Sequence, residues 1–303
     1  MLQGVIFDIQ SVLSDTEALY KNNFIHRLKA SGLKIASANP SSHESLHSCA
    51  MPLDNAPVPD IFLSLAKNLR LSLKECLVIT DSEAGTIAAA ATGIPCVGFA
   101  KPHSVGQKLS LAYALLESFE SADADYLYRT HAHALSYPAR ILTTERLFIR
   151  EFSREDFPAL YAMYTKPETV SFMDEVPSDF STEFEKHLAY ISGIYPLFDL
   201  ALWGVFEKNT GTLIGRAGFS LPEDTNEAFS LGYLIDVPYR RHGYAKECVS
   251  ALLSYAKRQG ASHISVKIKK SNIASQKTLE HCCTPYLFQR VEIESALYYH
   301  ILL

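Results

Sequence analysis

The chain has 303 residues, of which 48% are hydrophobic, with a formal net charge of −5 at pH 7 and a pI near 6.1. This length suffices for two domains with full cores, and the acidic balance argues against a nucleic-acid binder that depends on a large basic face. The most apolar segment, residues 87–100, is too short to span a membrane, and the first apolar run ends at Asp8, so we expect a soluble cytoplasmic protein with no membrane contact and no leader.

Residues 1–130 read as a separate α/β domain. Three apolar runs predict strands and two periodic stretches predict helices: residues 4–7, 76–79 and 95–99, and residues 61–69 and 84–91. Strands that alternate with helices predict a Rossmann-like parallel sheet. Asp8 and Asp81 follow two of the strands, so we expect their carboxylates to meet at the carboxyl edge of the sheet. Such a pair commonly holds Mg²⁺, and two solvated carboxylates are the alternative interpretation.

The opening of this domain, Asp8-Ile9-Gln10-Ser11-Val12-Leu13-Ser14-Asp15-Thr16-Glu17, is similar to the Asp-x-Asp-Gly-Thr-Leu-x-Asp-Ser/Thr-Glu motif of the haloacid dehalogenase (HAD) superfamily of phosphatases and phosphomutases. Residues 57–62 and 80–85 resemble two further motifs of that superfamily. The resemblance implies a HAD-like fold with the nucleophile at Asp8, but the stretch between the first motif and Pro57 is too short for the usual cap, so we expect a reduced cap.

Three positions depart from the HAD pattern. The second aspartate, which serves as general acid and base, is Gln10, and an amide cannot donate and retrieve that proton. The lysine that would neutralise the phosphoryl group corresponds to Ala56, and one acidic metal-site position is Thr80. We therefore interpret residues 1–130 as a degenerate HAD-like domain that retains at most a weak Mg²⁺ site at Asp8 and Asp81.

Residues 131–143 show little periodicity and read as a linker. The linker contains His131 and His133, whose spacing on a polar connector is typical of solvated histidines and not of a metal site.

The second half contains the most informative run of the chain. An apolar strand pattern at residues 231–235 leads into Asp236-Val237-Pro238-Tyr239-Arg240-Arg241-His242-Gly243-Tyr244-Ala245, and a helical pattern follows. The free N–H groups at a helix start, two arginines and Gly243 without a Cβ suit a diphosphate. A surface turn with two solvated arginines is the alternative interpretation.

The spacing Arg-x-x-Gly-x-Ala resembles the loop with which acetyltransferases of the GNAT superfamily hold the pyrophosphate group of acetyl-CoA. Residues 144–303 are similar, segment after segment, to the ribosomal-protein type of N-acetyltransferase within that superfamily. The matching segments are residues 144–150, 154–160, 166–170, 203–206 with 213–218, the loop itself, and 271–275. The resemblance implies a mixed-sheet α/β domain that binds acetyl-CoA.

The resemblance also implies site residues. The main chain of Leu234, Ile235 and Val237 would pair with the pantetheine arm and supply the oxyanion donor. The loop would hold the pyrophosphate through six consecutive residues: Arg240, Arg241, His242, Gly243, Tyr244 and Ala245. Asn272 would hydrogen-bond the pantetheine, or cap a helix.

Acetyl transfer to an amine also needs a proton donor for the departing thiolate and a base for the amine. The family's tyrosine corresponds to Leu279, so Ser275 is the expected donor, with helix capping as the alternative. Glu227, Glu292 and Glu294 are the candidate bases; Glu294 is favoured on a terminal strand face shared with Glu292, and a water chain is the alternative. Five large side chains are candidates to line an acceptor cleft or to form core: Phe172, Met173, Tyr195, Phe198 and Trp203.

The sequence therefore predicts an acetyl-CoA-dependent N-acetyltransferase, fused to an inactive HAD-like domain, whose acceptor is a protein N-terminus or a small amine. Two alternatives stay open. One is a Mg²⁺-dependent phosphatase that works from Asp8, and the other is a non-catalytic acetyl-CoA sensor.

Overall fold

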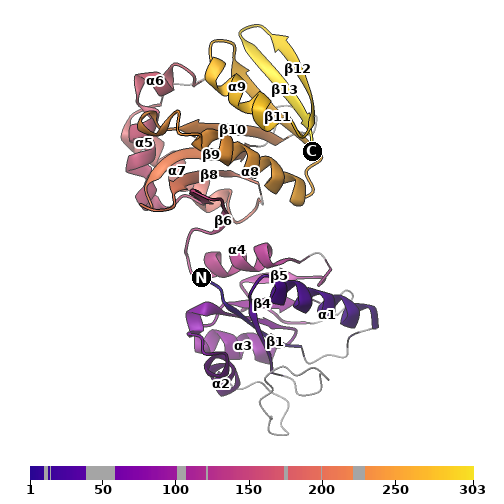
Figure 1. Ribbon diagram of the computed structural model, residues 1–303. Helices are drawn as coiled ribbons and strands as arrows, with labels where there is room; N and C mark the ends of the chain where they lie inside the picture. The colour runs from indigo at the N-terminus through magenta and orange to yellow at the C-terminus, as the bar shows by residue number, and fades with distance from the viewer. Residues whose placement is uncertain are drawn as a thin grey trace. The chain divides into compact units, whose positions relative to one another are not determined.

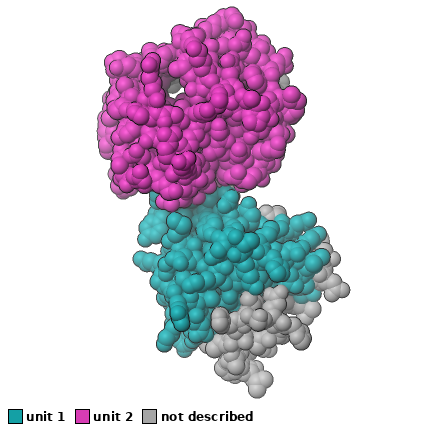
Figure 2. All heavy atoms as spheres, in the orientation of Figure 1, with its two compact units in different colours: residues 1–139 teal, residues 140–303 magenta. Residues whose placement is uncertain are grey.

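A computed structural model of the protein describes residues 1–9, 13, 15–38, 59–100, 107–120, 122–173, 177–198, 200–220 and 229–303. The chain forms two compact units, Met1–Ala139 and Arg140–Leu303, which Figure 2 shows in different colours. Within the described residues, no helix is long and apolar enough to cross a membrane.

Unit 1 is built on a five-stranded parallel sheet with the strand order β2-β1-β3-β4-β5 (Figure 1). Its elements are β1 (Gly4–Asp8), α1 (Asp15–Ala30), β2 (Lys34–Ser37), α2 (Pro59–Leu69), η1 (Leu73–Glu75), β3 (Cys76–Thr80), α3 (Glu83–Thr92), β4 (Cys96–Phe99), β5 (Ala114–Leu116) and α4 (Ala124–Ala134). The expected parallel sheet is therefore present.

Helices cover both faces of this sheet. Alternate residues of a strand point to opposite faces, and in β1 Phe7 packs with Phe24 of α1 while Ile6 packs with Phe62 of α2. Both faces are buried, which explains why the strands are continuous apolar runs.

The expected linker differs from the structure. Residues up to Ala134 belong to α4, because Asp123 caps that helix and Leu127 and His131 are buried on it. The far end of the segment, Arg140–Thr143, is β6, which pairs antiparallel with the next strand. Sequence reasoning missed both elements, since only the last turn of α4 falls within residues 131–143 and a four-residue strand is too short to show a period.

Unit 2 is built on an eight-stranded mixed sheet with the strand order β12-β13-β11-β10-β9-β8-β7-β6 (Figure 1). Its further elements are β7 (Leu147–Arg150), η2 (Arg154–Asp156), α5 (Phe157–Tyr164), α6 (Pro167–Val170), α7 (Phe180–Gly193), β8 (Leu202–Glu207), β9 (Leu213–Ser220), β10 (Phe229–Ile235), η3 (Val237–Tyr239), α8 (Tyr244–Arg258), β11 (His263–Lys269), α9 (Ile273–Cys282), β12 (Leu287–Ile293) and β13 (Ala296–Leu302). This is the mixed α/β sheet that the sequence predicts.

The two faces of this sheet carry different helices. On one face Trp203 of β8 packs edge-on against Tyr255 of α8, at 5.7 Å between ring centroids. Ala217 of β9 pairs with Trp203 and shares its face, so the neighbouring Arg216 points to the opposite face, where its guanidinium lies over Tyr164 of α5. Helix α8 therefore covers one face, and α5 covers the other.

Candidate active site

The central feature of unit 2 is a strand that parts from its neighbour. β10 pairs antiparallel with β9 along Ser230–Ile235, but its parallel pairing with β11 is limited to Phe229 and Ser230. Within the described residues, no strand pairs with the rest of β10 on the β11 side. The two parallel strands thus diverge and leave main-chain groups of β10 available to a ligand.

The hydrogen-bond pattern shows which groups these are. The amide of Asp236 donates to the carbonyl of Ile214 on β9 at 2.8 Å. Since ladder bonds alternate along a strand, the peptide groups of Leu234 also face β9, whereas those of Tyr233 and Ile235 face the divergence. The amide of Val237 donates to the Asp236 carboxylate at 2.8 Å. Of the three main-chain positions expected from the sequence, only Ile235 therefore presents its own N–H toward the divergence, and Tyr233 was missed.

The loop after β10 has an unusual backbone. Arg241 has φ of 65°, Gly243 has φ of 82°, and α8 begins at Tyr244 with Gly243 as its N-cap. A left-handed conformation costs a non-glycine residue such as Arg241 about 1–2 kcal/mol. The N–H groups of the first helical turn have no partner within α8. This loop has the conformation expected of an anion-binding helix start.

Arg240 does not point toward that helix start. Its Nε donates to the carbonyl of Ile235 at 2.9 Å, and its Nη2 donates to the Thr169 hydroxyl at 3.2 Å. The guanidinium thus ties the loop back to β10 and α6, and the expectation that the Arg240 side chain faces a diphosphate was wrong. Arg241 and His242 are exposed beside the loop.

Sequence reasoning missed Arg146, which braces the loop from the turn before β7. Its Nη1 donates to the carbonyl of His242 at 2.8 Å, and its Nε forms an ion pair with Glu247 at 2.7 Å. Its guanidinium carbon lies 4.7 Å from the ring centroid of Tyr244. Burial pushes the pKa of Glu247 upward, but hydrogen bonds from Thr144 and Arg146 hold that pKa below its usual value. The segment Thr144-Glu145-Arg146-Leu147 is recognised in the sequence as part of an expected strand. Its contacts with the loop are not, because the partner residues lie about 100 positions later in the chain.

Comparison with known proteins identifies this unit. The acetyltransferase (GNAT) domain family matches residues 146–282. The uncharacterized N-acetyltransferase YoaA of Bacillus subtilis is 26% identical over 140 residues, which are 46% of this chain and 79% of that protein. The C-terminal unit holds a GNAT acetyltransferase domain.

Two solved structures are also similar to this chain. An acetyltransferase of the GNAT family from Bacillus anthracis is 19% identical, and the match covers 54% of this chain and 98% of that chain with a TM-score of 0.46. A ribosomal alpha-N-protein acetyltransferase in complex with coenzyme A is 19% identical, and the match covers 54% of this chain and 98% of that chain with a TM-score of 0.43.

The last helix of the GNAT domain begins next to the divergence. Asn272 caps α9 by accepting from the Ser275 amide at 3.1 Å, so its side chain serves the helix-capping alternative. The Tyr233 hydroxyl donates to the main-chain carbonyl of Ser275 at 2.8 Å, and burial raises the pKa of Tyr233. Leu279, at the family's tyrosine position, is fully buried in the core. The structure thus brings Ser275 to the diverging strand through Tyr233.

The candidate bases of the GNAT domain lie elsewhere than expected. Glu294 is an exposed residue of the β12–β13 turn with φ of 49°, so it does not share a strand face with Glu292. Glu292 forms an ion pair with Lys270, which lowers the pKa of Glu292. Glu227 lies outside the described residues.

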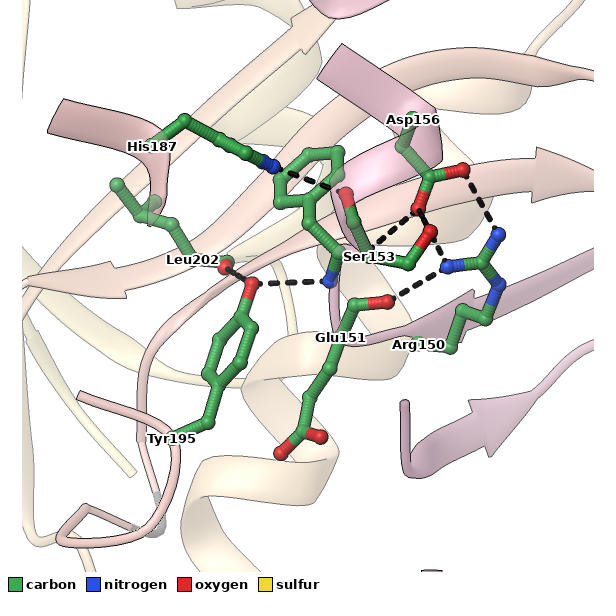
Figure 3. Close-up of polar contacts among 8 residues, drawn as sticks. Arg150, Glu151, Ser153, Asp156, His187, Tyr195 and Leu202 are labelled. Carbon is green, nitrogen blue, oxygen red and sulfur yellow. Dashed lines mark hydrogen bonds and ion pairs between the residues drawn. The ribbon is translucent and has the colours of Figure 1, made fainter. Parts of the chain in front are cut away.

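Two of the expected acceptor-cleft aromatics are structural. The Tyr195 hydroxyl accepts from the Phe152 amide at 3.0 Å and donates to the Leu202 carbonyl at 2.8 Å (Figure 3). Trp203 is buried in the core. The same close-up shows Arg150 in a bidentate ion pair with Asp156, at 2.6 and 2.9 Å. Phe172 and Phe198 are exposed, so among these aromatics only they are accessible at the surface.

Asp8 and Asp81 of unit 1 stand at the ends of the neighbouring strands β1 and β3, as the sequence predicts. Asp8 is buried and accepts a hydrogen bond from the Thr80 hydroxyl at 2.8 Å. A Cβ on Gly85 would lie 2.0 Å from the Thr80 hydroxyl, so α3 closes tightly over this edge. Within the described residues, no group of three or more metal-ligating side chains exists. This donor set does not favour Mg²⁺.

Proposed function

We propose that the GNAT domain transfers an acetyl group from acetyl-CoA to a primary amine. The observation that carries this proposal is the divergence of β10 from β11 directly before the left-handed loop and the start of α8. An extended amide-bearing arm suits the first feature because it can add main-chain hydrogen bonds to an open strand side. A diphosphate suits the second.

The reaction requires four changes at the thioester. The amine nitrogen forms a bond to the acetyl carbonyl carbon, the carbon–sulfur bond breaks, the nitrogen loses a proton and the thiolate gains one. The N–H of Ile235 is our candidate donor to the oxyanion, and Ser275 is our candidate donor to sulfur. The amine loses its proton to water, and Glu294 is our candidate to receive it through that water.

The acceptor class follows from the chemistry and from the relatives. One similar structure is a ribosomal alpha-N-protein acetyltransferase in complex with coenzyme A. A protein N-terminus and a small primary amine are therefore the acceptors that we propose, with acetyl-CoA as the cosubstrate.

Calorimetric titration with acetyl-CoA and CoA, followed by a thiol-release screen over amines and N-terminal peptides, tests this proposal. We expect saturable binding of both and thiol release with at least one acceptor. Absence of binding contradicts the proposal. Tight binding without thiol release from any acceptor favours the acetyl-CoA sensor instead.

For unit 1 we propose a HAD-like ancestry without phosphatase activity. The parallel sheet with Asp8 and Asp81 at one edge supports the ancestry. The hydrogen bond from Thr80 to Asp8 supports the loss of activity, since a hydroxyl occupies a position where that family has a metal-binding acid. Phosphate release from a general monoester substrate, abolished by Asp8→Asn, would contradict this proposal.

A further inference from the structure

One cation of the GNAT domain, Arg216, lies beside the diverging strand and has no ion pair within the described residues. Arg216 lies on β9 and is partly buried, and its Nε is buried without a hydrogen-bond partner. Within the described residues, no carboxylate lies at ion-pair distance from its guanidinium. Buried charged groups are normally paired, so this arginine calls for a partner that the described residues do not supply.

The surroundings of Arg216 are aromatic. Its guanidinium carbon lies 5.0 Å from the ring centroid of Tyr164 on α5. Burial raises the pKa of Tyr164 and of Tyr190 on α7, and the positive charge of Arg216 opposes both shifts. Both phenols therefore stay neutral at physiological pH and bring no negative charge to Arg216. Glu183, the acidic residue that acts on Tyr164, already pairs with Lys186 at 2.8 Å.

The described residues leave open space over the sheet at Gly232, on the face of Arg216. Arg216 pairs with Leu234 of β10, so the two side chains share a face, and Gly232 lies two residues before Leu234 on the same face. A Cβ on Gly232 would meet only one atom within 4 Å, a methyl carbon of Leu202 at 3.8 Å. Within the described residues, the diverging strand thus has open space at Gly232, on the sheet face that it shares with Arg216 and opposite to α8.

The surface of unit 2 has a hollow. Figure 2 shows it near the position of α6 in Figure 1. α6 is tied to the β10 end by the ion pair of Lys166 with Asp236, at 2.6 Å.

We propose that Arg216 binds the carboxylate of the acceptor, so that the enzyme acetylates amines that also carry a carboxylate, such as free amino acids or short peptides. A guanidinium fork is suited to bidentate carboxylate recognition. This inference rests on the proposed acetyltransferase function and specifies its substrate class.

The test compares the full-length protein with Arg216→Gln, Arg216→Lys and the control Arg258→Gln, whose arginine is exposed at the end of α8 and also lies near an aromatic ring. Calorimetry with acetyl-CoA comes first, and we expect equal affinity for all four proteins. Failure of the wild type to bind acetyl-CoA contradicts the proposed function itself.

Thiol release is then measured on matched sets of acceptors: an amino acid, its carboxamide and the amine without the carboxyl group, and a dipeptide with its C-terminal amide. We expect the wild type and Arg258→Gln to favour the carboxylate forms by about tenfold or more in kcat/KM. Arg216→Gln should reduce this preference to about twofold or less, and Arg216→Lys should restore part of it.

Two results would overturn the inference while leaving the acetyltransferase function intact. One is that the wild type turns over the carboxylate and amide forms equally, or turns over only the amide forms. The other is an undiminished carboxylate preference in Arg216→Gln. If acetyl-CoA binds and no amine of any class reacts, the sensor alternative replaces the proposed function and this inference falls with it.

Discussion

The guanidinium of Arg146 and the carbonyl oxygen of His242 form a 2.8 Å hydrogen bond between the turn before β7 and the loop before α8. An ion pair to Glu247 holds the same guanidinium in place. The loop before α8 is therefore shaped by a residue far away in the sequence as well as by its own glycine.

We expect Arg146→Ala to weaken acetyl-CoA binding by about tenfold, because loss of the bonds to His242 and Glu247 costs the loop about 1–2 kcal/mol of preorganisation. Arg154→Ala is the control, since Arg154 is exposed and stacks on Phe184 away from the loop. Calorimetric titration measures both. Equal affinity of Arg146→Ala and the wild type would refute the brace.

Gly243→Ala should lower both stability and acetyl-CoA affinity. Gly243 has φ of 82°, and a Cβ there would lie 3.3 Å from Nη2 of Arg146, the residue that braces the loop. Gly260→Ala is a matched control, with φ of 84° and no atom within 4 Å of its Cβ position. We expect both variants to lose about 1 kcal/mol in unfolding free energy, and only Gly243→Ala to bind acetyl-CoA at least tenfold more weakly. A similar affinity for the two variants would show that the loop does not contact the ligand.

Ser275→Ala should lower kcat by about ten- to a hundredfold with little change in acetyl-CoA affinity, because the thiolate then leaves without a positioned proton. Thr278→Val is the control on the same helix, since that hydroxyl bonds only to the Ala274 carbonyl. Steady-state thiol release gives kcat, and calorimetry gives the affinity. Full activity in Ser275→Ala combined with loss in Tyr233→Phe would transfer the role to Tyr233.

Glu247→Gln should change the pH dependence of stability. The pKa of Glu247 is held below its ordinary value of 4.5 by hydrogen bonds from Thr144 and Arg146 that outweigh burial. A depressed folded-state pKa gives stability that is present above the unfolded pKa and is lost as pH falls through the folded pKa. The variant should therefore be less stable than the wild type at pH 7, and the difference should shrink in acid below pH 4.5.

Denaturant unfolding of the two proteins between pH 7 and pH 3 measures this difference. Glu294→Gln serves as the control, because Glu294 is exposed in a turn. A stability difference for Glu247→Gln that stays constant with pH would argue against the ion pair.

Local patterns in the sequence predicted the local parts of the site. The strand, the left-handed glycine and the helix start follow one another within residues 231–256, so their spacing alone indicates an anion-binding loop. The sequence of β10 also predicts which side chains share a sheet face. It does not predict whether the peptide groups of Leu234 point toward β9 or away from it, because that direction depends on the pairing of β10 with β9.

Long-range contacts account for what the sequence missed. The inward turn of Arg240 depends on Thr169, 71 residues earlier, and the role of Arg146 depends on Glu247, 101 residues later. The placement of Glu294 failed for a different reason. A strand pattern continues through a tight hairpin turn without an obvious break in hydropathy, although the chain reverses there.

The ion pair between Arg146 and Glu247 also has a consequence for how the domain folds. It closes a loop of about a hundred residues, and the entropy of such a closure delays a contact until intervening structure has formed. The loop before α8 is therefore among the last parts of the domain to take its final conformation. Cosubstrate binding would then report on completed folding, and the bound form would resist unfolding and proteolysis more than the newly made chain.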